Sequence, residues 1–164
     1  MRNILFIVLL FSSKLILTES LPHFSFQDQY ENNLTSKNLT GYPSVILGCD
    51  KLDLELCRKA GRKLYWKMQN LLWKDANKVQ FIAYLDLRNS NSMIEKFIID
   101  SKNKAYESIY LDRKGELASG LKPDFVFLRI FNFQGKEISK EHLSSISDDD
   151  IQRIYEILKK EIKN

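Results

Sequence analysis

Residues 45–49 read Val45-Ile-Leu-Gly-Cys49, a short apolar run between Pro43 and Asp50. A continuous run of this length with β-branched residues is typical of a strand buried on both faces of a sheet. We therefore expect residues 45–49 to form the central strand of an α/β domain, with the chain continuing into a helix after Asp50.

A long amphipathic helix is predicted next, because apolar residues recur every three to four positions from Leu52 to about Trp73. The expected buried positions are Leu52, Leu56, Ala60, Leu64, Met68, Leu71 and Leu72. The run Val79–Leu87 is a second strong strand. The strand-helix-strand order predicts that the two strands pair in parallel through a right-handed crossover.

The C-terminal part adds a helix, a hairpin and a last helix. Residues 92–104 are predicted to be helical, with Met93, Ile94, Phe97 and Ile98 facing inward. Two runs, 124–131 and 136–139, flank a polar connection that ends in a glycine, which indicates a β-hairpin. Ser147 followed by three aspartates is a helix N-terminus signal, because an N-cap oxygen and early acids stabilise the first turn.

The segment 21–42 has no helical period. Phe24 and Phe26 point the same way if the chain is extended, which favours a short edge strand or hairpin. Asn33 and Asn38 each open an Asn-x-Thr triplet of the N-glycosylation pattern, so we expect this region to be exposed.

Residues 1–20 indicate a signal peptide. Arg2 gives a positive start, Ile4–Phe11 is apolar, and small residues stand at 18 and 20. A stable membrane anchor is disfavoured because about 18 apolar residues are needed and Lys14 interrupts the run. We expect cleavage after Ser20, a mature domain of residues 21–164, and a periplasmic or secreted location.

Composition excludes some classes of function. The 164 residues fit one domain, and the net charge of +4 comes from lysines and arginines interspersed with acids. This pattern is typical of solvated helix faces, so nucleic-acid binding is not expected. Two histidines, His23 and His142, offer no ligand spacing, and no metal or other cofactor is predicted.

The order of these elements resembles the redoxin branch of the thioredoxin-fold superfamily. Three phrases carry the likeness: Pro22-His-Phe-Ser-Phe-Gln-Asp-Gln29, Ile109-Tyr-Leu-Asp-Arg-Lys-Gly-Glu-Leu-Ala-Ser-Gly-Leu121 and Lys122-Pro-Asp-Phe-Val-Phe-Leu128. The C-terminal half is similar to small periplasmic relatives of the YtfJ type, which lack the active cysteines. The resemblance implies an α/β three-layer sandwich in which helices flank a mixed sheet.

The resemblance also implies a cis peptide before Pro123. In the family this loop faces the reactive turn, which would place Lys122 and Pro123 near Cys49 or Cys57. The chain lacks both the Cys-x-x-Cys of thioredoxins and the Pro-x-x-x-Thr-x-x-Cys of peroxiredoxins, and Ala60 stands where a second thiol would be. Peroxidase activity is therefore not favoured.

Three interpretations of the cysteines remain open. Cys57, near a helix start and followed by Arg58, could act as a thiolate nucleophile that Cys49 resolves. The pair could instead form a structural disulfide, or both thiols could be buried and inert. The acids at 50, 53 and 55 oppose a lowered thiol pKa.

We therefore predict either an exported thiol-disulfide oxidoreductase acting on protein thiols or a redox-inactive module. The module would hold a protein partner on the surface around Lys122, Pro123 and the helix start at Arg58. The oligomeric state is left open.

Overall fold

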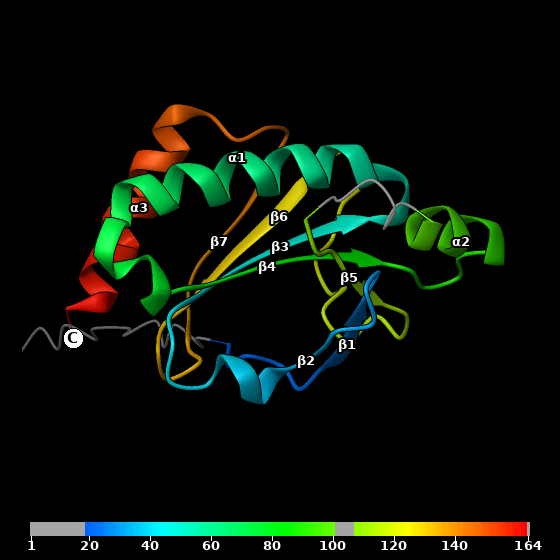
Figure 1. Cartoon of the computed structure of the whole chain (residues 1–164), viewed down its shortest axis with the longest axis horizontal. Coiled ribbons are helices and arrows are strands. Elements are labelled where there is room, and N and C mark those ends of the chain that lie inside the picture. Colours follow the sequence, from blue (N-terminus) through cyan, green and yellow to red (C-terminus); the bar gives the residue numbers. More distant parts are fainter. Residues whose placement is uncertain (1–18, 101–106, 164) are drawn as a thin grey trace, which may run out of the picture.

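The computed structural model describes residues 19–100 and 107–163, where one seven-stranded mixed sheet runs in the order β2-β1-β5-β4-β3-β6-β7. Helices α1 and α3 lie together along one face of this sheet (Figure 1). The strands are β1 (Ser25–Asp28), β2 (Asn33–Thr35), β3 (Ser44–Asp50), β4 (Gln80–Asp86), β5 (Tyr110–Asp112), β6 (Val126–Phe131) and β7 (Glu137–Leu143). The helices are α1 (Leu54–Leu72), α2 (Ser92–Asp100) and α3 (Asp148–Ile162), with 3-10 turns η1 (Ser36–Leu39), η2 (Lys51–Asp53) and η3 (Trp73–Lys78). Residues 1–18, most of the predicted signal peptide, lie outside the described part.

Residues 45–49 form an inner strand buried on both faces, as predicted, but the middle strand of the seven is β4 and β3 lies next to it. β3 is buried from Ser44 to Cys49 and lies between β4, its parallel neighbour, and β6, its antiparallel neighbour. Val45 and Leu47 face the core beneath α1, whereas Ile46 belongs to the core on the opposite face. The alternation follows from the two-residue period of a strand. The parallel pairing of β3 with β4 is as predicted, and α1 lies between them in the chain.

The N-terminal segment covers the second face of the sheet. β1 and β2 form the expected antiparallel hairpin, and β1 also pairs with β5. The rings of Phe24 and Phe26 are both buried and stack with centroids 4.5 Å apart. They pack with Ile46 and Tyr84, so this segment completes the second core.

The long helix is confirmed, but some of its predicted buried positions are wrong. Leu52 is 78% exposed, because it lies in η2, where a 3-10 turn is out of phase with the stripe of α1. Leu71 is 39% exposed. Trp66 in α1 and Trp73 just after it are also exposed.

The inward face predicted for the second helix is also partly wrong. Ile98 is fully buried and Ile94 packs against the core, as expected. Met93 and Phe97 are exposed. Ile94 and Ile98 are spaced i, i+4, as are Met93 and Phe97, so the four residues form two adjacent stripes along the helix. Only the isoleucine stripe of α2 faces inward. Residues 101–104 of the predicted helix lie outside the described residues.

The C-terminal elements follow the prediction. β6 and β7 form an antiparallel hairpin, although β7 runs on to Leu143 and all six residues of β6 are buried. Ser147 caps α3: its Oγ accepts the Asp150 N–H at 3.1 Å, and the Asp150 carboxylate accepts the Ser147 N–H at 2.9 Å. Ile154 and Leu158, in the predicted stripe, are fully buried.

Close packing fixes β4 against β3. Tyr84 is fully buried, its ring lies over Gly48, and its hydroxyl donates to the Leu117 carbonyl oxygen at 2.7 Å. A Cβ at Gly48 would lie 2.7 Å from Tyr84 Cε1 and closer still to the hydroxyl oxygen. Only glycine leaves room for this ring.

We expect Gly48→Ala to lower the free energy of unfolding by about 1–3 kcal/mol, because the added methyl displaces Tyr84 and its hydrogen bond. Urea denaturation followed by circular dichroism measures the change. The matched control is Gly61→Ala in α1, where the new Cβ would meet its nearest neighbours at 3.8 Å. That change should raise the free energy of unfolding by about 0.5–1 kcal/mol through helix propensity. Equal effects at both positions would contradict the packing argument.

Candidate functional site

Cys49 and Cys57 form a disulfide, with their Cα atoms 5.9 Å apart. Cys49 ends the buried part of β3, and Cys57 lies in the first turn of α1. The bond therefore ties the carboxyl end of an inner strand to the start of the helix that follows it. The interpretation of two inert free thiols is wrong, whereas the reactive and structural interpretations of the pair both remain.

The disulfide is part of the main core. Both cysteines are 0% exposed and cluster with Leu54, Leu85 and Val126. Cys57 Sγ lies 3.7 Å from the carbonyl oxygen of Tyr84, which is placed to accept the S–H of the reduced thiol. Exchange at this bond consequently requires a local opening of the start of α1.

Each acid near the cysteines is engaged elsewhere. Asp50 accepts the N–H of Leu52 at 2.9 Å and caps η2. Asp53 accepts the N–H of Asp124 at 2.9 Å, and Glu55 pairs with Arg58 at 3.1 Å. These contacts hold the carboxylates in hydrogen bonds and an ion pair.

The contact between Asp53 and Asp124 attaches the proline loop to the start of α1. Lys122 and Pro123, the residues before Asp124, are exposed. The hydrogen bond from Asp124 to Asp53 therefore holds this loop beside the start of the helix that carries Cys57.

The cis peptide expected before Pro123 is wrong, since residues 19–100 and 107–163 contain no cis peptide bond. Pro123 and Asp124 form a turn, and Asp124 has φ of 66°. A positive φ at the third position of a type II turn accommodates a trans proline at the second.

Arg58 is the remaining predicted site residue, and its side chain is only 7% exposed. It lines a cavity together with Cys57, Arg62 and Glu107. Arg62 donates two hydrogen bonds to the Glu107 carboxylate, at 2.7 and 2.8 Å. These bonds are the main cause of a lowered pKa at Glu107, to which the charge of Arg58 also contributes.

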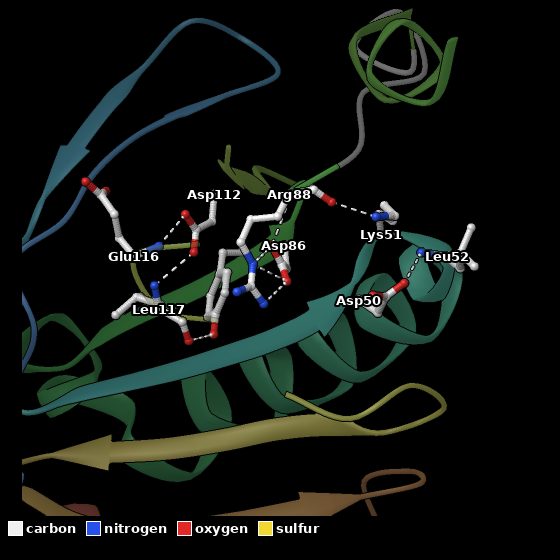
Figure 2. A network of polar contacts seen from close by, with 9 residues as sticks. Asp50, Lys51, Leu52, Asp86, Arg88, Asp112, Glu116 and Leu117 are labelled. Atoms are coloured by element: carbon white, nitrogen blue, oxygen red, sulfur yellow. Dashed lines mark hydrogen bonds and ion pairs between the residues drawn. The ribbon is translucent and has the colours of Figure 1, made fainter. Parts of the chain in front are cut away.

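Sequence reasoning missed a row of three aspartates. Asp50, Asp86 and Asp112 are neighbours in register at the ends of β3, β4 and β5. Figure 2 shows Asp86 facing Arg88, whose guanidinium donates to it at 2.8–3.1 Å. Each aspartate directly follows an apolar run in the sequence. Because the carboxyl ends of parallel strands lie at the same edge of a sheet, this pattern could have predicted the row.

The third aspartate organises the turn after β5. Asp112 is fully buried and accepts the N–H groups of Glu116 at 2.8 Å and Leu117 at 2.9 Å (Figure 2). The Leu117 carbonyl in turn accepts the Tyr84 hydroxyl. Each carboxylate of the row thus has a protein partner, and the row acts as structural support for this end of the sheet.

Comparison with protein families and with curated proteins gives no match for this chain. Solved structures do match. The chain is similar to BsSco, a member of the Sco family of cytochrome c oxidase assembly proteins, with a TM-score of 0.61 and 13% identity over 90% of this chain and 95% of the other.

Two further matches are described as thioredoxins. The thioredoxin domain of a thiol-disulfide oxidoreductase from Bacteroides vulgatus superposes with a TM-score of 0.58 and 19% identity, covering 85% of this chain and 96% of that domain. The exposed lipoprotein thioredoxin Etrx1 from Streptococcus pneumoniae strain TIGR4 gives 0.60 and 10% identity, covering 83% and 99%. The chain therefore has the thioredoxin fold, as the resemblance implied. These matches do not single out the redoxin branch within the superfamily.

Breaking the disulfide should destabilise the protein. Closing a loop of this size is worth about 2.6 kcal/mol in the chain-entropy model, and the bond lies in the core. We expect the double variant Cys49→Ala, Cys57→Ala to lose about 2–4 kcal/mol in urea denaturation relative to the oxidised protein. Adding dithiothreitol should not change the stability of this variant, because it has no disulfide to reduce. Equal urea midpoints for the oxidised wild-type protein and the variant would contradict a stabilising role of the disulfide.

Proposed function

We propose that the chain is a thiol-disulfide exchange protein that acts on protein thiols through Cys49 and Cys57. One observation carries the proposal: the disulfide joins the carboxyl end of an inner strand to the first turn of the following helix. The hydrogen bond from the Asp124 N–H to Asp53, just before α1, supports a role for the proline loop in holding the partner.

The exchange proceeds in two substitutions at sulfur. In the reduced protein the Cys57 thiolate attacks a disulfide of the partner, forming a mixed disulfide and releasing one partner thiolate. The Cys49 thiolate then attacks Cys57 Sγ, restores the internal bond and releases the second partner thiolate. Two electrons pass to the partner, and the protein is oxidised.

Local electrostatics support Cys57 as the attacking group. It lies in the first turn of α1, where the helix dipole favours negative charge, and Arg58 follows it. Asp53 and Glu55, the opposing acids, are engaged with Asp124 and Arg58.

Insulin reduction with dithiothreitol tests the proposal. We expect the wild-type protein to accelerate it, Cys57→Ser to abolish the acceleration, and Cys49→Ser to accumulate a mixed disulfide, because attack occurs but resolution does not. A redox potential above about −300 mV, in the range of catalytic dithiols, belongs to this outcome. Indistinguishable rates for the wild-type protein and Cys57→Ser would sink the proposal.

The complete burial of both sulfurs favours a second candidate, a redox-inactive binding module with a structural disulfide. The partner would then contact the exposed Lys122 and Pro123 beside the start of α1. This candidate predicts no insulin reduction and a potential below about −300 mV, which the same measurements separate from the first.

We also propose that the protein is exported. A disulfide persists in an oxidising compartment, and residues 1–20 have the pattern of a signal peptide. Among the described residues, no helix combines the length and the apolar character needed to cross a bilayer. Cleavage after Ser20 would remove Glu19, whose carboxylate lies 3.3 Å from Lys140 Nζ. It would keep the bond from the Leu21 nitrogen to the Gly135 carbonyl, at 2.7 Å.

Mass spectrometry of the full chain, expressed with a C-terminal tag in a host with a secretory pathway, tests this expectation. The mature protein should begin at Leu21 and be recovered outside the cytoplasm. An intact N-terminus on cytoplasmic protein would contradict it.

A further inference from the structure

Asp53 stands at the N-cap position of α1 but does not cap the helix. A side-chain oxygen at this position usually accepts an N–H of the first turn of its own helix. Within the described range 19–100, Asp53 makes no such bond. Its carboxylate instead accepts the N–H of Asp124 at 2.9 Å. The side chain that could stabilise the helix therefore holds the proline loop, residues 121–125, at the helix start.

The proline loop passes both ends of the disulfide. At one end it is bonded to Asp53, which directly precedes the helical turn that holds Cys57. At the other end it enters β6 at Val126, and the register of β6 with β3, continued by one residue, aligns Val126 with Cys49. Val126 and both cysteines are fully buried in one cluster. The loop thus borders the bond at each of its two elements.

The proline loop is the part of this edge that moves most easily. Residues 122–125 are all exposed, so few of their own packing contacts are lost when they lift. The first turn of α1, by contrast, contains the buried Leu54 and Cys57. Lifting the loop therefore disturbs the core less than unwinding the helix.

Both ends of the loop are fixed to the sheet. The Gly120 carbonyl oxygen lies 2.6 Å from His142 Nε2, and the Phe127 ring stacks on the same imidazole with centroids 4.6 Å apart. Movement is confined to the residues between Gly120 and Phe127, and the hydrogen bond to Asp53 ties that stretch to α1. Asp124 has φ of 66°, a conformation uncommon outside glycine, which release of the loop would relax.

The geometry points to Asp53 as a positioning residue that sets access to the disulfide. With the loop closed, its carboxylate holds the Asp124 N–H and both sulfurs are buried. When the loop lifts, the same carboxylate is free to cap α1, so the turn that holds Cys57 stays folded. This role rests on the proposed exchange at Cys49 and Cys57, and it makes release of the loop the local opening that exchange requires.

Reduction of the oxidised protein by excess dithiothreitol tests this role. One dithiothreitol thiolate attacks a sulfur of the bond, the second closes the oxidised ring, and both cysteines leave as thiolates that alkylation and mass spectrometry count. Asp53→Ser keeps a capping oxygen that stands one bond closer to the backbone and cannot hold the loop. It should speed reduction about tenfold, since a hydrogen bond to a charged group is lost. Asp53→Asn keeps an acceptor of the same length and should stay within about twofold of the wild-type rate.

Asp50→Ser is the matched control. Asp50 is also an N-cap residue, and it accepts the N–H of Leu52 at 2.9 Å within its own turn, η2 (Figure 2). The change removes the same charge near the cysteines and keeps a capping oxygen, so the reduction rate should match that of the wild-type protein. Equal acceleration by Asp50→Ser and Asp53→Ser would overturn the inference. Equal acceleration by Asp53→Asn and Asp53→Ser would do the same, because charge would then set the rate.

Urea separates movement of the loop from unfolding of the helix. Below the unfolding transition, urea speeds reduction according to the surface that the opening exposes. We expect the rates of the wild-type protein and Asp53→Ser to change little in this range. A steep rise in both would show that the disulfide is reached by unfolding of α1, and would overturn the inference.

Dithiothreitol reports access to the bond whether or not the protein acts on other proteins. Faster reduction of Asp53→Ser, together with insulin reduction that Cys57→Ser leaves unchanged, would support control by the loop and contradict exchange with protein thiols. Equal dithiothreitol rates for Asp53→Ser and the wild-type protein overturn control by the loop, even where Cys57→Ser abolishes insulin reduction.

Discussion

The structure depends on one constraint, the burial of β3 on both faces. Val45 and Leu47 pack beneath α1, Ile46 packs on the N-terminal segment, and Tyr84 covers Gly48 so closely that no side chain fits there. A strand held this way has its position relative to β4 and β6 fixed. Its last buried residue, Cys49, is therefore delivered to the core side of α1, where Cys57 meets it.

The local pattern of the chain was enough to predict most of the fold. The apolar run 45–49, the period of α1 and the capping sequence at Ser147 each correspond to an observed element. Which apolar stripe of a helix faces inward depends on the elements packed against it, so the inward positions predicted for Met93 and Phe97 are wrong. The pairing of the cysteines was one of three open interpretations, because spacing alone does not determine whether two thiols meet.

Features that join distant segments were beyond the sequence pattern. The bond from Asp124 to Asp53 spans 71 positions, and the register of the three terminal aspartates depends on how the parallel strands align. The resemblance implied a cis peptide before Pro123, whereas the peptide there is trans and is followed by Asp124 at a positive φ. In each case the three-dimensional arrangement, and not local propensity, sets the outcome.

The exposure of the two tryptophans has a practical result for spectroscopy. Trp66 is 57% exposed and Trp73 is 74% exposed, and the chain has no other tryptophan. Indole groups already in contact with water change their surroundings little when the chain unfolds. The emission maximum of the native protein should therefore lie close to that of the denatured chain, so intrinsic fluorescence will report on the surface of α1 and not on the state of the core.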